Sequence, residues 1–441
     1  MNIEELLNNQ RKLVRTIERK LPCVLNVKNY VTPQTIEEMR EVGPLSPHLE
    51  IERRWFYFKK NSKEAFYEIV DKLSSLKILE ENNSFSNIFN EILKHIEKWL
   101  PEGKCDHLVF IHSCLESLIE KQRDHVYYTA LEGISLENIK EFNLGSMQVG
   151  RFENYIEEIE ENKKSHEQEP HIASSTNEFI EKNFKGKIVI RGEVRGDQEK
   201  SKEKFVDNCQ LVVNMLRLIA STFYEQGYSR KYVSINLPSG KSSGSIQYLS
   251  SDISRSGLIL GWSSTEPEEM PINIEMVEEL REYYFFNELI SFAWEQDQTE
   301  IESSIITAIH WFGEAQNERS LDNSFMLHWT AIETVFSIGK DYIAENIAVG
   351  LSTLLAFGGY KIISPEDKET TYYQIKNLYS KRSKVIHRGH RKKVTTEDII
   401  EISKYSKWVI LTLLGLRNKG FRTLSELKNE TDRIHGLTKQ I

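Results

Sequence analysis

Apolar side chains recur at two different spacings in residues 1–150, and these spacings predict both helices and strands. Two groups of five residues follow the helical spacing and predict amphipathic helices: Ile3, Leu6, Leu7, Leu13 and Ile17, then Phe66, Ile69, Val70, Leu73 and Leu76. The aromatic runs at 55–58 and 126–128 are typical of strands. We therefore expect an α+β region in residues 1–150.

Glutamates dominate the next stretch, with seven of them between Glu153 and Pro170. Few apolar residues accompany them, and such a composition buries too little surface to order itself strongly, so we expect a linker or loop at 151–175. Residues 176–298 again predict α+β structure. A long apolar helical pattern covers 206–223, and strand-like runs between Gly, Ser and Pro turns occur at 187–194, 232–237, 245–249 and 257–262.

Only helical patterns follow residue 298, which predicts a bundle of four or five helices over 299–420 and a tail over 421–441. The last helix of the bundle is predicted to begin after Thr395 or Thr396, where Glu397 and Asp398 suit the positive end of a helix dipole. Five residues from the apolar stripes of these helices are expected to be buried: Trp329, Phe336, Leu351, Leu378 and Leu413. The predicted fold class is an α+β N-terminal region followed by an all-α bundle.

The composition is that of a globular protein, with 441 residues, 39% of them hydrophobic and 28% charged. The longest apolar stretch, at 408–416, is shorter than the roughly 20 residues of a membrane-spanning helix. Residues 1–20 lack the apolar core and cleavage site of a signal peptide. Four scattered cysteines do not suggest a disulfide framework. These features predict a cytoplasmic protein without membrane contact.

Charge is distributed unevenly along the chain. The formal net charge is −9, yet residues 371–420 contain twelve Lys or Arg and only three acids. A basic patch on an acidic protein indicates a selected anionic partner, and RNA is the candidate that we favour.

Residues 378–390 are the most informative segment, because they join a predicted helix end to a loop and contain no acid. Arg382 and His387 lie five residues apart there, which on a helix separates them by about 140° around the axis, so they can flank a groove. Histidine moves protons near neutral pH and a guanidinium binds phosphate oxygens bidentately. This pair suits attack of an RNA 2′-hydroxyl on its neighbouring phosphate without a metal or another cofactor. A basic helix end that only complements the helix dipole is the alternative.

The block Tyr379-x-x-Arg382-x4-His387, followed by Gly389, resembles the R-x4-6-H signature of HEPN domains, in particular the Apea-like group. The upstream segments AIHWF at 308–312 and LHWTAIE at 327–333 resemble the two preceding helices of that group, and the similarity covers roughly 301–417. The resemblance implies a helical bundle that forms a homodimer or a higher homo-oligomer. It also implies an endoribonuclease of the kind found in antiphage and toxin systems. Arg382 and His387 match the catalytic pair of that family, and Glu333 matches the acidic position that supports it.

Further consequences follow from this resemblance. RNA is expected to contact the other basic residues of the segment: Lys381, Lys384, Arg388, His390, Arg391, Lys392 and Lys393. Residues 1–298 are expected to sense a trigger, such as a phage-derived one, or to restrain the bundle. Because Arg382 and His387 are expected on a polar helix end, their substitution should leave the fold intact. Ser383 stands where many active members have Asn, Asp or His, so a non-catalytic RNA-binding or protein-interaction module remains the alternative.

Two other motifs suggest metal or phosphate chemistry but depart from the known spacings. Cys105-x-His107-x4-His112-x-Cys114 contains possible zinc ligands, yet apolar residues separate them and ordinary buried Cys and His are favoured over a zinc enzyme. The segment PSGKS at 238–242 lacks the first glycine of a phosphate-binding loop, because Ile235 stands at that position. We expect a hairpin turn there and no bound cofactor.

Overall fold

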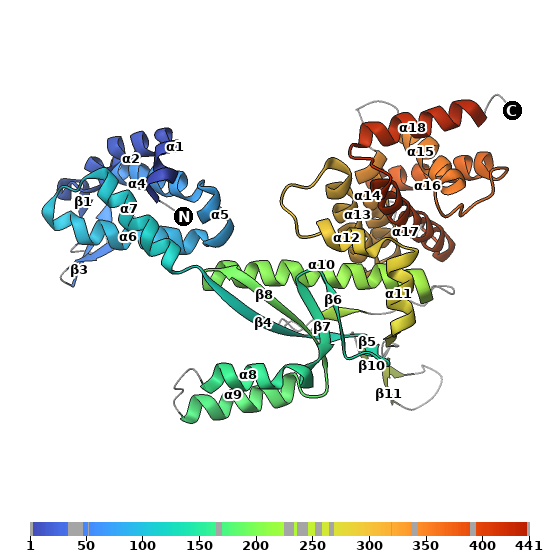
Figure 1. Ribbon diagram of the computed structural model, residues 1–441, viewed down its shortest axis with the longest axis horizontal. Coiled ribbons are helices and arrows are strands. Elements are labelled where there is room, and N and C mark those ends of the chain that lie inside the picture. Colours follow the sequence, from blue (N-terminus) through green and yellow to red (C-terminus); the bar gives the residue numbers. More distant parts are fainter. Residues whose placement is uncertain are drawn as a thin grey trace. The chain divides into compact units, whose positions relative to one another are not determined.

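The computed structural model of the protein describes residues 3–33, 47–51, 53–164, 170–224, 233–235, 246–251, 258–263, 269–318, 320–336, 343–388 and 394–438. Only the backbone is described for 162–164, 170–176, 246–251, 258–263 and 386–388. The chain forms two compact units (Figure 1). The first contains Met1–Tyr127 and Glu193–Val206, and the second contains Tyr128–Gly192 and Asp207–Ile441.

The first unit combines helices with a small antiparallel sheet. Its strands are β1 (Tyr30–Val31), β2 (His48–Ile51) and β3 (Arg54–Phe58), with β3 in the centre. Its helices are α1 (Ile3–Asn9), α2 (Arg11–Val24), α4 (Lys60–Ser74), α5 (Lys77–Asn82), α6 (Phe85–Trp99) and α7 (His107–Glu120). The predicted strand at 55–58 is confirmed, and so is the helix at 66–76 up to Ser74, where α4 ends. The single N-terminal helix that we predicted is in fact two helices, which separate at Gln10.

Helix caps and one apolar core hold this unit together. Ser84 begins α6 by accepting a 3.2 Å hydrogen bond from the backbone N–H of Asn87, and Asp106 begins α7 by accepting a 2.8 Å bond from Leu108. The apolar faces of the helices then meet in a buried cluster whose fully covered members include Ile17, Phe66, Ile92, Phe110 and Leu115.

A five-stranded sheet contains the two strands in which the chain passes from one unit to the other. Its order is β6 (Glu141–Leu144), β7 (Met147–Arg151), β8 (Ile188–Gly196), β4 (Arg123–Glu132) and β9 (Ser234–Ile235). Strands β4 and β8 both contain a unit boundary. Two smaller sheets belong to the second unit: β5 (Ile134–Leu136) pairs in parallel with β12 (Met270–Ile272), and β10 (Ile246–Ser251) pairs antiparallel with β11 (Leu258–Ser263). The strands that we predicted at 126–128, 187–194, 245–249 and 257–262 are confirmed within the described residues, and only 233–235 of the predicted strand at 232–237 are described, where β9 lies.

The glutamate-rich segment is helical where we expected a linker. Helices α8 (Ile156–Lys164) and α9 (Pro170–Asn183) lie side by side (Figure 1). The carboxylate of Glu158 accepts hydrogen bonds from Arg191 at 2.6 and 2.8 Å and from Tyr128 at 2.7 Å, and both partners belong to the sheet. Ile159 also packs against the apolar cluster of Phe152, Tyr155 and Val189. These contacts anchor α8 although its composition is mostly polar.

Helix α10 (Gln198–Tyr224) runs through the last boundary between the units. In the second unit it packs on two helices of the C-terminal part, α13 (Glu300–Asn317) and α17 (Thr396–Asn418). The buried guanidinium of Arg217 donates to the carbonyl oxygen of Gly313 at 3.0 Å, and the buried ammonium of Lys407 donates to that of Ser221 at 2.8 Å. Two charged side chains therefore hold α10 against the helices that follow it.

The C-terminal part is a helical bundle preceded by two short helices, α11 (Ile274–Glu282) and α12 (Phe286–Phe292). The bundle contains α13, α14 (Leu321–Phe336), α15 (Ile343–Phe357), α16 (Lys368–Arg388) and α17. Thr299 and Thr395 begin α13 and α17 with capping boxes. All five residues that we expected to be buried are at most 5% exposed, so the core prediction for the bundle is confirmed.

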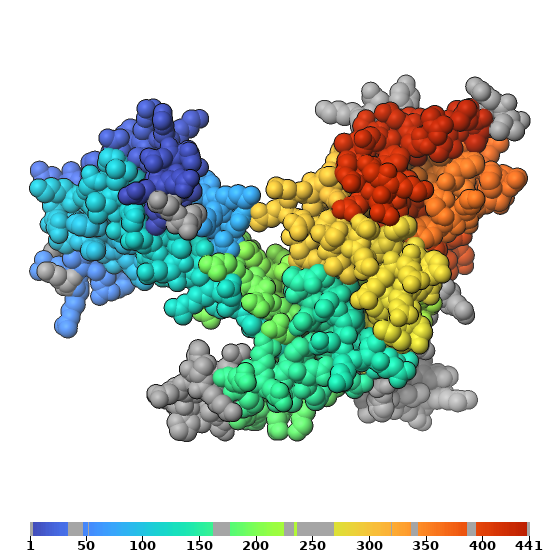
Figure 2. Space-filling model, in the orientation of Figure 1, coloured from blue at the N-terminus to red at the C-terminus, as the bar shows by residue number. Residues whose placement is uncertain are grey.

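Residues 421–441 are not a tail, because they contain the helix α18 (Leu424–Thr438). Leu427 is buried, and Lys368 at the start of α16 donates to Thr438 at 2.7 Å. Figure 2 shows α18 in red on the outside of the bundle. An α+β N-terminal region is thus followed by a mostly helical C-terminal part. Among the helices described, none has an apolar stretch long enough to cross a bilayer.

Candidate active site

Arg382 and Glu333 meet between two helices of the bundle. Arg382 lies near the end of α16 and Glu333 near the end of α14. The Nη2 of Arg382 donates to Oε2 of Glu333 at 2.7 Å, and the two side chains are 20% and 18% exposed. The structure therefore brings together two of the three residues that we predicted to act in catalysis.

Two aromatic rings pack in sequence beside this ion pair. The guanidinium of Arg382 lies 5.5 Å from the ring centroid of Tyr379, one helical turn earlier in α16. Tyr379 in turn meets the buried ring of Trp329 edge-on, with centroids 5.3 Å apart. Trp329 precedes Glu333 by four residues, so both helices present an aromatic residue and a charged residue on one face. Tyr379 therefore connects the guanidinium to the buried core at Trp329.

Burial and charge act in opposite directions on Glu333. Burial raises the pKa of its carboxyl above the ordinary value, and the neighbouring Arg382 guanidinium only partly offsets this rise. The carboxylate form therefore depends on Arg382 for its stability.

The ion pair does not satisfy all of its polar atoms. Within the part of the chain that the structure describes, Oε1 of Glu333, Nε of Arg382 and Nε1 of Trp329 are buried without a hydrogen-bond partner. Leaving a buried polar atom unpaired costs about 1–3 kcal/mol. Three such atoms in one cluster indicate polar capacity that a ligand or another chain can use after a small rearrangement.

The third predicted catalytic residue, His387, is described only by its backbone. Helix α16 continues through Arg388, so His387 lies on the same helix as Arg382, about 7.5 Å further along its axis. The side chains of His387 and Arg388 lie outside the described part of the chain, as do the predicted RNA-binding residues His390, Arg391, Lys392 and Lys393.

The structure separates the two remaining basic candidates. The ammonium of Lys381 donates to both carboxylate oxygens of Asp398, at 2.7 and 2.9 Å. Asp398 also completes the capping box of α17, so Lys381 ties α16 to the start of α17. Lys384 is exposed and has no hydrogen bond or ion pair with the residues described. Of the two, Lys384 is the one whose charge is available to a phosphate.

The Cys and His residues that suggested zinc lie on or next to α7. Cys114 is fully buried in the apolar core, and His112 pairs with Glu116 at 3.4 Å on the same helix. Across the described ranges, no group of three or more His, Cys, Asp or Glu side chains is placed to hold a metal ion. The segment at 238–242 lies outside the described residues.

Sequence reasoning missed two features of the structure. The contact between Lys381 and Asp398 could have been suspected from the pattern Thr395-x-x-Asp398, which is a capping box and fixes where the Asp398 carboxylate lies. A polar cavity in the first unit, with Arg123 and Lys121 in its wall, had no local signal because its residues come from four separate segments.

Comparison with protein-family models gives no match, and no curated protein or solved structure matches the chain. The function has to be inferred from the side chains of this protein itself.

Proposed function

We propose that this protein is a metal-independent endoribonuclease of the HEPN type. The observation that supports the proposal is the ion pair of Arg382 and Glu333, with the ring of Tyr379 beside the guanidinium and Trp329 packed edge-on against Tyr379. The family resemblance expects an acid at position 333 to support an arginine at position 382. Their contact at 2.7 Å is the arrangement that such a role requires.

The proposed reaction is an internal transfer within RNA. The 2′ oxygen attacks the adjacent phosphorus, a new bond from phosphorus to the 2′ oxygen forms, and the bond to the 5′ oxygen breaks. The proton of the 2′-hydroxyl goes to a base and the departing 5′ oxygen receives a proton, and His387 carries out one of these transfers. The products end in a 2′,3′-cyclic phosphate and a 5′-hydroxyl. Neither an oxidant nor a metal is needed for this balance.

Arg382 supplies the fixed positive charge in this scheme. Negative charge accumulates on the non-bridging phosphate oxygens in the transition state, and a guanidinium that is already oriented stabilises it without reorganisation. Glu333 is a positioning residue, because it contacts Arg382 and acts through it. Lys384 and the basic residues at 388–393 bind the RNA backbone, and a second copy of the chain completes the groove beside α16.

The size of the remaining chain suggests regulation. A cell cannot tolerate a ribonuclease that is always active, so we place a sensing or restraining role in residues 1–298 and a phage-derived trigger among the candidates. Antiphage defence or toxin-like growth arrest is the corresponding biological role. A non-catalytic RNA-binding or protein-interaction module is the alternative, which Ser383 favours.

The test is cleavage of total RNA by the purified protein in EDTA, with the new ends mapped by sequencing. His387→Ala should lower the cleavage rate by about 10²- to 10⁴-fold, the usual share of general acid or base catalysis. Arg382→Lys should recover little of the loss in Arg382→Ala, because an ammonium does not reproduce the planar fork.

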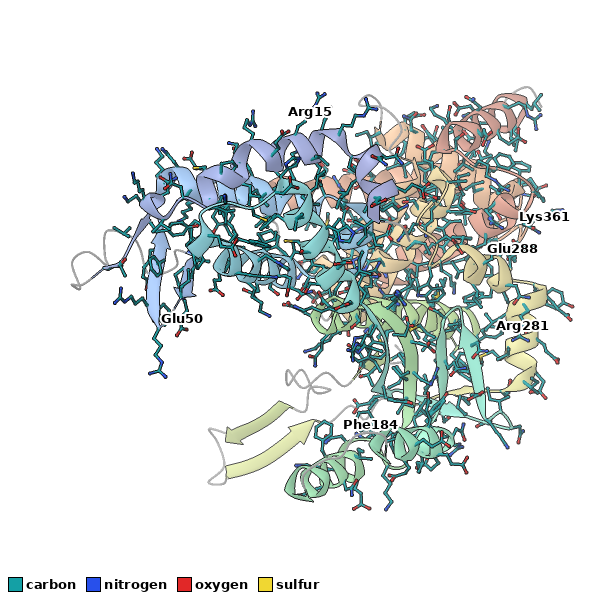
Figure 3. All side chains as sticks on the ribbon, turned by 60° about the vertical axis from the view of Figure 1, so that its left-hand side comes forward. Arg15, Glu50, Phe184, Arg281, Glu288 and Lys361 are labelled. Carbon is teal, nitrogen blue, oxygen red and sulfur yellow. The ribbon has the colours of Figure 1, made fainter. Side chains whose placement is uncertain are left out.

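The matched control is Arg281→Ala. Arg281 is exposed on α11, is labelled in Figure 3 and makes no polar contact with the residues described. Its substitution therefore removes one positive charge, as Arg382→Ala does, at a place away from the site. Its cleavage rate should equal that of the wild type. Full activity of His387→Ala, or a requirement for added metal, would exclude the ribonuclease. RNA binding without any cleavage would support the binding-module alternative.

A further inference from the structure

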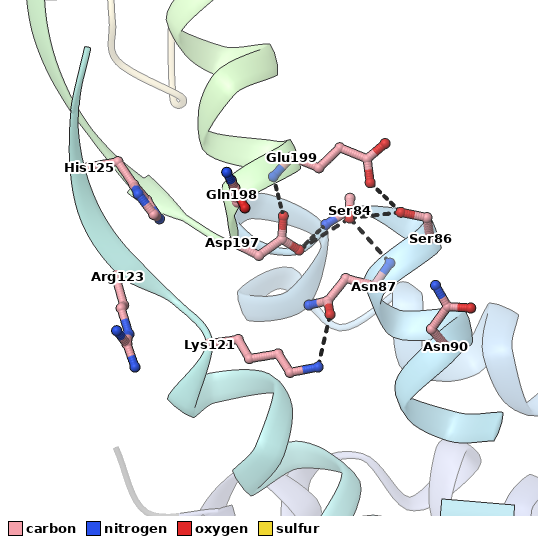
Figure 4. A pocket seen from close by; sticks show the side chains of 10 residues that line it. All are labelled: Ser84, Ser86, Asn87, Asn90, Lys121, Arg123, His125, Asp197, Gln198 and Glu199. Carbon is pink, nitrogen blue, oxygen red and sulfur yellow. Dashed lines mark hydrogen bonds between the residues drawn. The ribbon is translucent and has the colours of Figure 1, made fainter. Parts of the chain in front are cut away.

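A polar cavity of about 430 Å³ lies within the first unit. Its walls come from the start of α6, the residue after α7, the first residues of β4 and the start of α10 (Figure 4). This volume lies within the range that small organic ligands occupy in proteins. We propose that the cavity binds a small phosphate-bearing organic molecule, a function that does not depend on the ribonuclease activity.

The acidic groups of the cavity are already engaged. One carboxylate oxygen of Asp197 accepts from the backbone N–H and the hydroxyl of Ser84, at 2.7 and 3.2 Å. Its other oxygen accepts from the N–H groups of Glu199 and Lys200 at 3.0 and 2.8 Å. Asp197 thereby caps α10 and also holds Ser84, the residue that caps α6, while Glu199 accepts from the hydroxyl of Ser86. Both oxygens of Asp197 are therefore occupied by donors of the protein itself.

Several donors of the cavity are not engaged. Arg123 is exposed and has no hydrogen bond or ion pair with the part of the chain described. Nδ2 of Asn87 and Nε2 of His125 are buried without a hydrogen-bond partner among the described residues. The Oδ1 of Asn87 already accepts from Lys121 at 3.2 Å, so only its N–H groups remain. Figure 4 shows Arg123 and His125 on the strand across the cavity from Asn87 and Asn90 on α6.

This distribution selects the chemistry of the ligand. A group that reaches donors on two opposite walls needs several acceptor oxygens, and one that lies beside a free guanidinium is preferably an anion. A phosphate monoester meets both conditions. A bare phosphate ion would leave most of the cavity empty, whereas the amides of Asn90 and Gln198 can bind hydroxyl or ring nitrogen atoms of an organic part.

The test is calorimetric titration of the full-length protein with ribose 5-phosphate and with adenosine monophosphate. Ribose and adenosine serve as the uncharged counterparts. At least one phosphorylated probe should bind with a Kd below about 1 mM, and its counterpart without phosphate should bind at least tenfold more weakly. Arg123→Ala should weaken binding by about tenfold or more, because a charge-assisted bond is lost. Asn90→Ala should weaken it by about two- to tenfold.

Two further variants control for charge and for folding. Arg15→Ala removes an exposed arginine of α2 in the same unit (Figure 3) that does not line the cavity, and it should leave the Kd unchanged. Arg123→Lys keeps the charge without the planar fork and should recover only part of the affinity. Thermal unfolding should be the same for wild type and the Arg123 variants, because the exposed Arg123 side chain has no hydrogen bond or ion pair with the described residues to lose. No binding of either phosphorylated probe, equal binding by Arg123→Ala, or binding of RNA alone would overturn the proposal.

Discussion

Removing the guanidinium of Arg382 should destabilise the bundle even though Arg382 was expected on a polar helix end. In Arg382→Ala, Glu333 would keep its carboxylate at a site where only 18% of its side chain is exposed, without its one ion-pair partner among the described residues. Its Oε1 already lacks a hydrogen-bond partner among the described residues, and Oε2 would lose the one it has. The expectation that this substitution leaves the fold intact therefore needs revision.

The magnitude follows from the degree of burial. Exposed ion pairs contribute about 0.2–1 kcal/mol, whereas removing one partner of a buried pair costs about 3–5 kcal/mol. A pair that is about four-fifths covered lies between these limits, so we expect a loss of about 2–3 kcal/mol for Arg382→Ala near pH 7.5. Adding Glu333→Gln removes the uncompensated charge, and the double variant should regain about 1–2 kcal/mol.

The pH dependence provides a second signature. Burial raises the pKa of Glu333 in the folded protein, and losing Arg382 removes the charge that opposes this rise. At pH values between its ordinary pKa and its raised folded-state pKa, such a carboxyl binds more protons in the folded protein than in the unfolded chain. Folding is therefore favoured as the pH falls through that interval. The deficit of Arg382→Ala should shrink as the pH is lowered, and the double variant should not show this trend.

The assay is amide hydrogen exchange of the full-length protein under increasing urea, read out in peptides from α14 and α16. It reports opening of the bundle separately from the rest of the chain. Measurements at pH values on both sides of the interval, corrected for intrinsic exchange, give the opening free energy for each variant. Arg281→Ala is again the control. If Arg382→Ala opens no more readily than Arg281→Ala near neutral pH, or if Glu333→Gln restores nothing, the ion pair does not carry the stability that we assign to it.

Two further predictions concern packing and RNA affinity. A Cβ on Gly313 would lie 2.1 Å from Oδ1 of Asn214, so Gly313→Ala should lower the free energy of unfolding, measured by thermal unfolding, by about 1–3 kcal/mol. A Cβ on Gly436 would have no atom within 4 Å, so Gly436→Ala should stabilise α18 by about 0.5–1 kcal/mol. If RNA binds the basic segment, the slope of log Kd against log salt concentration should fall by about 0.7 in Lys384→Ala. It should not change in Lys381→Ala, because the Lys381 ammonium is held by Asp398. Equal losses in the two variants would contradict this assignment.

The helices of the bundle could be predicted because their apolar residues repeat with the period of a helix. Helix α18 was missed because it buries few residues, Leu427 and Thr431 among them, so the repeat is weak. Helix α8 was missed for a different reason. Its order depends on the contact of Glu158 with Arg191, 33 residues later, and composition gives no sign of such a contact.

The candidate site could be predicted in part. The family resemblance assigned Glu333 to support Arg382, and the two side chains meet in the structure although 49 residues separate them. Burial of Arg382 itself could not be predicted, because it depends on how closely α14 and α16 pack. The same limit applies to Lys381, whose partner Asp398 comes from the next helix.

The double cap at Asp197 has a consequence for how the chain folds during synthesis. Ser84 begins α6, but the carboxylate that accepts from its N–H is 113 residues later in the chain. At roughly 5–20 residues per second, a ribosome takes about 6–23 s to add that length. Throughout this interval the backbone N–H of Ser84 has to rely on water, and strands of the second unit emerge before the first unit is complete. A pause in translation between residues 84 and 197 would prolong the time during which the first unit is incompletely folded.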